Sequence, residues 1–436
     1  MSRQTACDTI AGLERFYFRV LGDVLFVFDF DDDIAHVLNA AAARFFLSLS
    51  DSFAAPAAIA VSWGVACPHE DAHLADCLAQ WETRGWIERD AAGLVRLRGR
   101  SSGVAGAAAA PSPVSRADAL LLDQCQVRLA DRSVGFRLFA ADESPAADTV
   151  SGHGEAATAA RTEGGDGTTY LASGQRLFGF LGGFLDPAPE RHAPVATIDM
   201  IVARKGISLH CGPRRLITED AAIAVGKARL WLLNLVYRQP APAILVHGAA
   251  LATPDGALVV AGVSGAGKST LSAYLVTRGW RFGADDSLAL GFAEGEAVVL
   301  PCPGAINLKP GSFDALSPFY PEMDALPLIG DGDKRGRYLP VPRPAHLSPT
   351  GPENHVRGFV FPRFEAGSPT RVTTIPVAPA LLELMKAEFD LAEEAGVAEI
   401  DAFFDTLEGC PRYAVIYSDL AEMDAVLRRL AAGEPA

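Results

Sequence analysis

Short apolar runs separated by turn residues fill the first hundred positions and predict a small unit of strands and helices. Residues 16–20 and 24–28 flank the turn Leu21-Gly22-Asp23 and predict a β-hairpin. Beyond them the pattern predicts a third strand at 34–38, helices at 40–49, 57–65 and 70–83, and a terminal wing-like hairpin from 85–88 and 95–97. This order of elements is typical of a winged-helix domain of the α+β type.

Low-complexity stretches divide the rest of the chain. Residues 99–117 are dominated by Ala, Gly, Ser and Pro, the composition of a flexible linker, so we predict one domain over 1–98 and another over 118–436. Residues 141–167 predict a disordered loop within the second domain. The segment 327–352, rich in Gly, Pro, Lys and Arg, predicts a mobile loop.

The second domain mixes strands with helices. Strands are predicted at 126–129, 135–139, 197–203, 207–210 and 412–417. Helical spacing predicts a helix at 219–238, with Thr218 as its N-cap, and another at 420–430. The mixture predicts an α/β fold.

The most informative local pattern is a strand, a glycine-rich loop and a helix in direct succession. An apolar run at 257–261 follows the turn Pro254-Asp255-Gly256, and helical spacing resumes at 270–277. Between them, residues 262–270 fit the pattern G-x-x-x-x-G-K-[ST] and predict a binding site for the phosphates of ATP or GTP. The residues predicted to contact the nucleotide are Gly262, Ser264, Gly265, Ala266, Gly267, Lys268, Ser269 and Thr270.

Each residue type in this loop has a physical role in holding phosphate. The glycines let backbone N–H groups close around the phosphates, and the helix N-terminus adds partial positive charge. Lys268 would reach the terminal phosphates, and the Ser269 hydroxyl would ligate Mg²⁺. The alternative is a glycine-rich turn that binds no ligand.

Three polar residues lie near strand ends around the loop. His247 precedes Lys268 by 21 positions, on the strand predicted to pair with the one entering the loop, and Asp285-Asp286 ends the strand after the loop helix. Because ligands of open α/β sheets bind at the carboxyl ends of strands, one carboxylate can hold Mg²⁺ while its neighbour accepts a hydroxyl proton. The alternatives are a helix cap or solvated turn for the aspartates and a hydrogen-bonded core histidine for His247.

Composition narrows the classes of partner. The 436 residues carry a net charge of −15 at pH 7 without a basic run, so nucleic acid is not expected as a partner. The N-terminus lacks an apolar signal core and no apolar stretch approaches the roughly 20 residues that span a bilayer, so a cytoplasmic location without membrane contact is expected. Seven scattered cysteines fit reduced thiols better than a disulfide framework.

The residues around the glycine loop resemble the core of HPr kinase/phosphorylase. The matching runs are His247-Gly248, residues 262–269, Arg278-Gly279-Trp280-Arg281 and Ala284-Asp285-Asp286. The resemblance is specific over about residues 243–292 and looser beyond them. It implies a P-loop kinase core of the type related to phosphoenolpyruvate carboxykinase, and a homo-oligomer.

The same resemblance implies a role for each candidate residue. Lys268 would stabilise the transferred phosphate, while Ser269 and Asp285 would serve Mg²⁺. Asp286 would take the proton of the acceptor hydroxyl, and His247 would order that carboxylate or the phosphates.

One departure from that family lies downstream. HPr kinases carry a glutamate and an arginine just before a Gly-rich motif containing Ile-Asn, whereas residues 300–309 here read Leu-Pro-Cys-Pro-Gly-Ala-Ile-Asn-Leu-Lys and lack the metal-holding glutamate. Phosphorylase activity and HPr as the acceptor are therefore not expected, and the chain resembles HPr-kinase-related proteins with other acceptors. Five basic residues are candidates to neutralise phosphate charge: Lys309, Lys334, Arg335, Arg337 and Arg343. The alternative is that they are solvated surface residues.

The first domain resembles PqqD-like domains in two short motifs. These are residues 36–46, which enter the first predicted helix through Leu38-Asn39, and residues 78–87, which enter the wing through Gly85-Trp86. The resemblance implies recognition of the leader of a ribosomally made peptide, which can add as a strand to a sheet edge. DNA binding is disfavoured because residues 1–96 hold 14 acidic and 7 basic side chains, and a purely structural or dimerising unit is the remaining alternative.

These patterns together predict a kinase that uses ATP and Mg²⁺ to phosphorylate a serine or threonine hydroxyl on a ribosomally made peptide or small protein. A small-molecule kinase would use the same core without needing the first domain. A nucleotide-gated regulatory protein would bind ATP and transfer its phosphate slowly or not at all.

Overall fold

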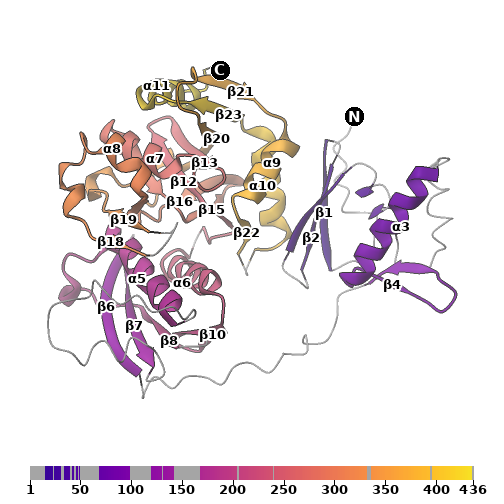
Figure 1. Ribbon diagram of the computed structural model, residues 1–436, viewed down its shortest axis with the longest axis horizontal. Coiled ribbons are helices and arrows are strands. Elements are labelled where there is room, and N and C mark those ends of the chain that lie inside the picture. The colour runs from indigo at the N-terminus through magenta and orange to yellow at the C-terminus, as the bar shows by residue number, and fades with distance from the viewer. Residues whose placement is uncertain are drawn as a thin grey trace. The chain divides into compact units, whose positions relative to one another are not determined.

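The chain forms two compact units, seen in a computed structural model (Figure 1). The first comprises Met1–Ala108 with Val377–Leu382, and the second comprises Ala109–Pro376 with Glu383–Ala436. The described residues are 15–22, 24–30, 34–39, 42–43, 46–47, 49, 68–98, 119–129, 131–141, 167–203, 206–238, 240–330, 335–392 and 395–434. The predicted linker at 99–117, the helix at 57–65 and nearly all of the loop at 141–167 lie outside these residues, so those predictions stay untested.

The described part of the first unit contains an antiparallel sheet, a helix and a hairpin, all near their predicted positions. The sheet joins β1 (Phe16–Leu21), β2 (Val24–Asp29) and β3 (Ile34–Leu38) in that order. The helix is α3 (Pro68–Thr83), and the hairpin pairs β4 (Ile87–Arg89) with β5 (Val95–Leu97). The assignment to the winged-helix class stays a prediction.

Aromatic packing and one buried ion pair hold this unit together. The rings of Phe46, Trp81 and Trp86 are buried and contact one another, which removes much apolar area from water. The Arg15 guanidinium lies 2.6 Å from the Asp29 carboxylate and also donates to the Gly85 carbonyl at 2.7 Å. It therefore ties the strand hairpin to the turn before β4.

Several sheets build the second unit. A six-stranded sheet has the order β14 (Arg281–Ala284), β12 (Gly248–Thr253), β13 (Gly256–Ala261), β20 (Val356–Phe364), β23 (Arg412–Tyr417) and β21 (Arg371–Thr374). A four-stranded sheet joins β16 (Glu296–Leu300), β15 (Leu288–Ala293), β11 (Ile244–Val246) and β22 (Phe389–Leu391). A small sheet joins β17 (Ile306–Leu308), β19 (Gly336–Leu339) and β18 (Leu328–Ile329).

A five-stranded sheet and two packed helices form a further layer of this unit. Its order is β10 (Arg214–Thr218), β9 (Gly206–Cys211), β8 (Ala196–Ala203), β7 (Arg132–Ala141) and β6 (Ala119–Leu129). The helices α5 (Gly167–Leu181) and α6 (Ala221–Val236) pack on each other and on this sheet. Sequence patterns predicted α6 but not α5.

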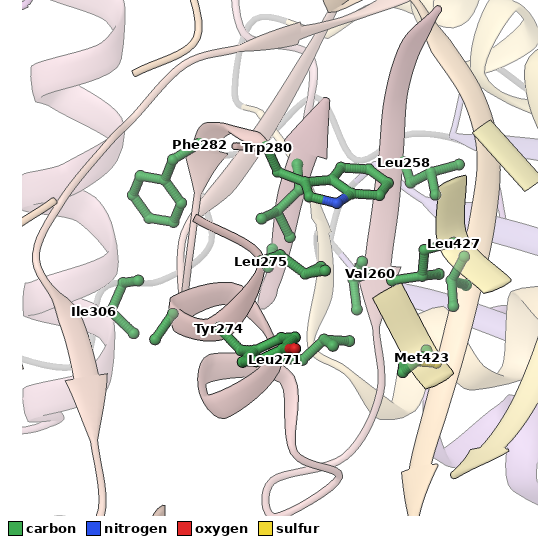
Figure 2. Packing of buried hydrophobic residues seen from close by; sticks show 14 of the residues in the cluster. Leu258, Val260, Leu271, Tyr274, Leu275, Trp280, Phe282, Ile306, Met423 and Leu427 are labelled. Atoms are coloured by element: carbon green, nitrogen blue, oxygen red, sulfur yellow. The ribbon is translucent and has the colours of Figure 1, made fainter. Parts of the chain in front are cut away.

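Apolar side chains from strands and helices pack together on the six-stranded sheet and form the main core. All residues of β12 and β13 are buried, as expected for strands covered on both faces. Figure 2 shows part of the cluster, with side chains from β13, from α7 (Lys268–Thr277) and from α11 (Leu420–Ala431). The remaining helices of the described chain are α8 (Phe313–Leu316), α9 (Val377–Lys386) and α10 (Val397–Gly409).

One local prediction is wrong, and a second is incomplete. The N-cap of α6 is Asp220, whose carboxylate accepts from the backbone N–H groups of Ala222 at 2.7 Å and Ile223 at 3.2 Å. Thr218 instead ends β10, where its hydroxyl accepts from the Asp220 N–H. The segment 327–352 is not a plain loop, because β18 and β19 within it pair with each other and β19 pairs with β17.

Candidate functional site

Four strands of the six-stranded sheet end at one edge, and the candidate residues meet there. β13, β20 and β23 are parallel, while β12 is antiparallel to both of its neighbours, β13 and β14. The carboxyl ends of β13, β14, β20 and β23 therefore lie at the same edge, and β12 begins there. Such an edge is where α/β sheets bind ligands.

His247 reaches this edge in a different way from the one predicted. It does not lie within a strand but at a bend between β11, which belongs to the four-stranded sheet, and β12, which belongs to the six-stranded sheet. Its N–H donates to the Ala387 carbonyl at 3.1 Å. The histidine thus lies where the chain passes from one sheet to the other, next to the residues that follow β13 and β14.

The loop between β13 and α7 presents backbone groups to solvent. Residues 263–265 are exposed, and α7 begins at Lys268 directly after the loop. Gly267 occupies the N-cap and has no side chain to accept from the first turn, so the N–H groups there are available to an anion. The predicted succession of strand, loop and helix is confirmed, whereas the phosphate ligand stays a prediction.

Gly267 is required by the backbone and by its neighbours. Its φ of 93° lies in the left-handed region that side chains disfavour. A Cβ at this position would collide with the hydroxyl of Tyr417, which is buried at the end of β23. Any larger residue would therefore displace Tyr417 or the loop.

Lys268 lies beneath the loop rather than in solvent. It is 7% exposed, and its Nζ donates to the carbonyls of Gly262 at 2.6 Å and Val263 at 3.3 Å. Burial lowers the pKa of Lys268, against the opposing charges of Asp285 and Asp286. A buried ammonium beside two carboxylates is suited to bind the charge of a phosphate.

The other basic candidates have different positions. Lys309 is exposed, and its Nζ lies 3.1 Å from the Ser264 hydroxyl, so it adds a second ammonium at the loop. Arg337 pairs with Asp324, and Arg343 donates to the Leu185 carbonyl. Arg335 is exposed, and Lys334 lies outside the described residues.

Asp285 is a buried carboxylate with one oxygen unpaired. It is 1% exposed; Oδ1 accepts from the Ser272 hydroxyl at 3.2 Å, and Oδ2 has no hydrogen-bond partner in the described part of the chain. Burial, and then the charge of Asp286, raises the pKa of Asp285 to about 6, while the hydroxyls of Ser269 and Ser272 act in the opposite direction.

These features fit a cation such as Mg²⁺. An orphaned carboxylate oxygen beside the Ser269 hydroxyl offers two hard oxygen ligands. Among the described residues no group of three or more His, Cys, Asp or Glu side chains could hold a metal alone. Mg²⁺ usually takes one or two protein ligands together with phosphate oxygens and water.

Added Mg²⁺ with ADP should stabilise the protein more at about pH 8 than at about pH 5. The pKa of Asp285 is raised from 3.8 to about 6, so its contribution to metal-free stability is complete below pH 3.8 and is lost as the pH rises through about 6. Mg²⁺ competes with that proton, so the metal's effect should grow over the same range. Thermal unfolding with and without Mg²⁺ measures this difference.

The matched control is Asp285→Asn. Without the buried charge, the metal-free protein should be more stable by about 1–3 kcal/mol at about pH 8, and the pH-dependent gain from Mg²⁺ should disappear. An equal gain at both pH values in the unmodified protein would contradict the role assigned to Asp285.

Asp286 is held between an arginine and a histidine side chain. Its Oδ2 accepts from Arg229 Nη1 at 2.7 Å, and its Oδ1 lies 3.1 Å from His247 Nδ1. Burial alone would raise the pKa of Asp286, but Arg229 and His247 together lower it, so the carboxylate is ionised at neutral pH. Its backbone is left-handed, with φ 72°, a conformation that Asp adopts more readily than most residues.

Arg229 is a site residue that sequence patterns missed. It lies on α6, its side chain is 12% exposed, and it also donates to the Ser287 hydroxyl at 2.9 Å. Its guanidinium lies 4.1 Å from the centre of the Phe180 ring, a cation–π contact that fixes it further. The sequence does contain a signal for Arg229. It precedes Leu232 by three positions and Leu233 by four, so it lies on the same face of the helix as these buried leucines, where an arginine is unusual.

Glu388 supplies a glutamate near the site from a distant part of the chain. It precedes β22, is exposed, and has a left-handed backbone with φ 55°. Burial has the largest effect on the pKa of Lys268 and lowers it. The charge of Glu388 raises this pKa, as the charges of Asp285 and Asp286 do more strongly. Glu388 therefore adds a carboxylate near the site, although the downstream segment 300–309 contains no glutamate.

Comparison with known proteins adds little to this geometry. No family model matches the sequence, and no curated protein matches it. One similar solved structure is the Hpr(Ser) kinase/phosphatase from Coxiella burnetii, with 14% identity and a TM-score of 0.24, covering 43% of this chain and 91% of that one. A TM-score this low establishes no common fold.

Among the described residues, no helix combines the length and the apolar character needed to cross a bilayer.

Proposed function

We propose that the second unit is an ATP-dependent phosphotransferase acting on a hydroxyl group. The observation that carries the proposal is the meeting, at one sheet edge, of a glycine loop with its buried Lys268, the unpaired oxygen of Asp285, and the clamped carboxylate of Asp286. Phosphoryl transfer depends mainly on positioning and charge neutralisation. The site offers both.

In the proposed reaction the acceptor oxygen bonds to the γ-phosphorus as the bond from that phosphorus to ADP breaks. The electron pair leaves on ADP, and the hydroxyl proton passes to Asp286. Arg229 and His247 hold the Asp286 carboxylate in position and ionised, so it can accept that proton. Lys268, with Lys309 at the rim of the loop, offsets the phosphate charge.

Mg²⁺ would be held by Asp285 and Ser269. When bound, it would neutralise charge on the phosphate oxygens. The raised pKa of Asp285 means that this ligand becomes fully ionised only above about pH 6.

The acceptor in this proposal is a peptide or small protein presented by the first unit. Among the described strands of that unit, β1 and β3 lie at the two edges of the sheet. Edge strands carry unpaired backbone groups to which an extended peptide can add. Val20 of β1 and Ile34 of β3, 50% and 49% exposed, offer apolar contacts to such a strand.

Tethering the leader on one unit would raise the concentration of the acceptor hydroxyl at the other. A ribosomally made precursor peptide should therefore be phosphorylated about 10²–10⁴-fold faster than the same peptide without its leader at low concentration. Intact-mass measurement after incubation with ATP and Mg²⁺ reports the gain of one phosphate. The control is a precursor with a scrambled leader of equal length.

The outcomes separate the proposal from its rivals. Equal rates with and without the leader would rule out the tethering role. Consumption of a small metabolite instead, by a protein lacking the first unit, would favour a small-molecule kinase. Tight nucleotide binding without transfer to any acceptor would favour a nucleotide-gated regulatory protein.

A further inference from the structure

Phe364, the last residue of β20, is an exposed aromatic side chain beside the glycine loop. It is 51% exposed. Its Cβ lies 3.6 Å from the position that a Cβ on Gly267 would occupy, where the loop meets α7. Isolated exposed apolar residues are ordinary on protein surfaces, so the location of Phe364 is what distinguishes it.

The ring of Phe364 is supported from one side by Tyr417. The parallel strands β20 and β23 pair these two residues, so their side chains share a face of the sheet. Their ring centres lie 5.7 Å apart in a T-shaped contact, and Tyr417 is 1% exposed. The ring is therefore anchored to the core on one side and open to solvent on the other.

The charged neighbours of Phe364 do not occupy its open side. Arg363 and Glu365 form an ion pair with each other at 3.0 Å. Because successive side chains of a strand alternate, these two lie on the opposite face from Phe364. The open side of the Phe364 ring is therefore an apolar surface adjacent to the predicted phosphate site.

We propose that Phe364 is the surface on which the base of the bound nucleotide stacks. The inference rests on the proposed function, because it assumes that the loop holds the phosphates. A nucleotide with its phosphates in the loop carries its base one ribose away, and Phe364 lies beside Gly267 at the margin of the loop. Aromatic side chains bind nucleobases through their π-faces and discriminate weakly between bases.

The test compares ADP with inorganic tripolyphosphate as ligands of the full-length protein in the presence of Mg²⁺. Phe364→Ala should weaken ADP binding by about 10–100-fold, the usual loss when a stacking aromatic is removed, and leave tripolyphosphate binding within about twofold. Calorimetry measures both affinities. Phe364→Leu, which keeps the bulk but not the ring, should behave like the alanine variant, whereas Phe364→Trp should retain ADP binding.

Phe319 provides a matched control. It is 43% exposed and makes a T-shaped contact with Tyr274 at 5.2 Å, so Phe319→Ala removes a similar aromatic elsewhere in the same unit. That variant should bind both ligands like the unmodified protein.

Each other result is decisive. Unchanged ADP binding in Phe364→Ala and Phe364→Leu would overturn the stacking surface while leaving the phosphate site intact. Equal weakening of ADP and tripolyphosphate would also overturn it, by showing that Phe364 supports the loop. If the unmodified protein bound neither ligand, the proposed function would fail, and the stacking surface with it.

Discussion

Replacing Asp286 with Asn should slow phosphoryl transfer by about 10²–10⁴-fold, the usual contribution of a positioned proton acceptor. Asparagine has nearly the same shape and tolerates a left-handed backbone, so the fold around position 286 should survive. The amide cannot accept the proton of the acceptor hydroxyl. Single-turnover formation of phosphorylated peptide, followed by intact mass, measures the rate.

Nucleotide affinity separates this role from a structural one. Since Asp286 is assigned to the acceptor and not to the nucleotide, ADP affinity in Asp286→Asn should stay within about threefold of the unmodified protein. Arg229→Gln should give a smaller loss of rate, because it removes one of two groups that hold the carboxylate. A variant Asp286→Asn that transfers phosphate at more than about a tenth of the normal rate would exclude Asp286 as the proton acceptor.

Replacing Lys268 with Met should abolish measurable nucleotide binding, weakening ADP affinity by more than about 100-fold. Methionine fills most of the volume of the buried lysine stem but removes the ammonium that would contact two or more phosphate oxygens, and each charged hydrogen bond contributes about 1.5–3 kcal/mol. Calorimetry with ADP and Mg²⁺ gives the affinity, and phosphorylation of peptide should fall below detection.

Stability provides the control for Lys268→Met. Burial lowers the pKa of Lys268, so its replacement removes the cost of a buried charge, but the carbonyls of Gly262 and Val263 lose their donor. Because the two effects oppose each other, the thermal midpoint should change little. Lys309→Ala, at an exposed position after β17 whose ammonium lies beside Ser264 of the loop, should weaken ADP binding by only a few fold. Normal ADP affinity in Lys268→Met would show that the loop does not hold phosphate.

The parts of the site that could be predicted from sequence are those encoded within a short stretch of chain. The strand β13, the loop after it and the helix α7 follow each other directly, and Asp285-Asp286 follows the next strand. Glycine spacing and apolar runs are local signals, so these elements were found with boundaries close to the observed ones. The cap of α6 was misassigned because Thr218 and Asp220 are both good cap residues two positions apart.

The residues that complete the site come from distant segments. Arg229 lies 57 positions before Asp286, and Tyr417 lies 150 positions after Gly267. Tyr417 stands in no pattern that distinguishes it from an ordinary strand residue, and the only local signal for Arg229 is its place on the apolar face of α6. Tyr417 reaches Gly267 because β20 pairs with both β13 and β23. Arg229 reaches Asp286 because α6 packs near the same sheet edge.

The left-handed backbone at Asp286 also limits how this protein can diverge. With φ at 72°, most side chains other than Asp, Asn and Gly would strain position 286. Asn and Gly can each be reached from an aspartate codon by one nucleotide change, and each would discard the carboxylate while preserving the fold. Under the proposed function, a descendant of this sequence that binds nucleotide without transferring phosphate is therefore a short evolutionary step away, and the residue at position 286 would identify it.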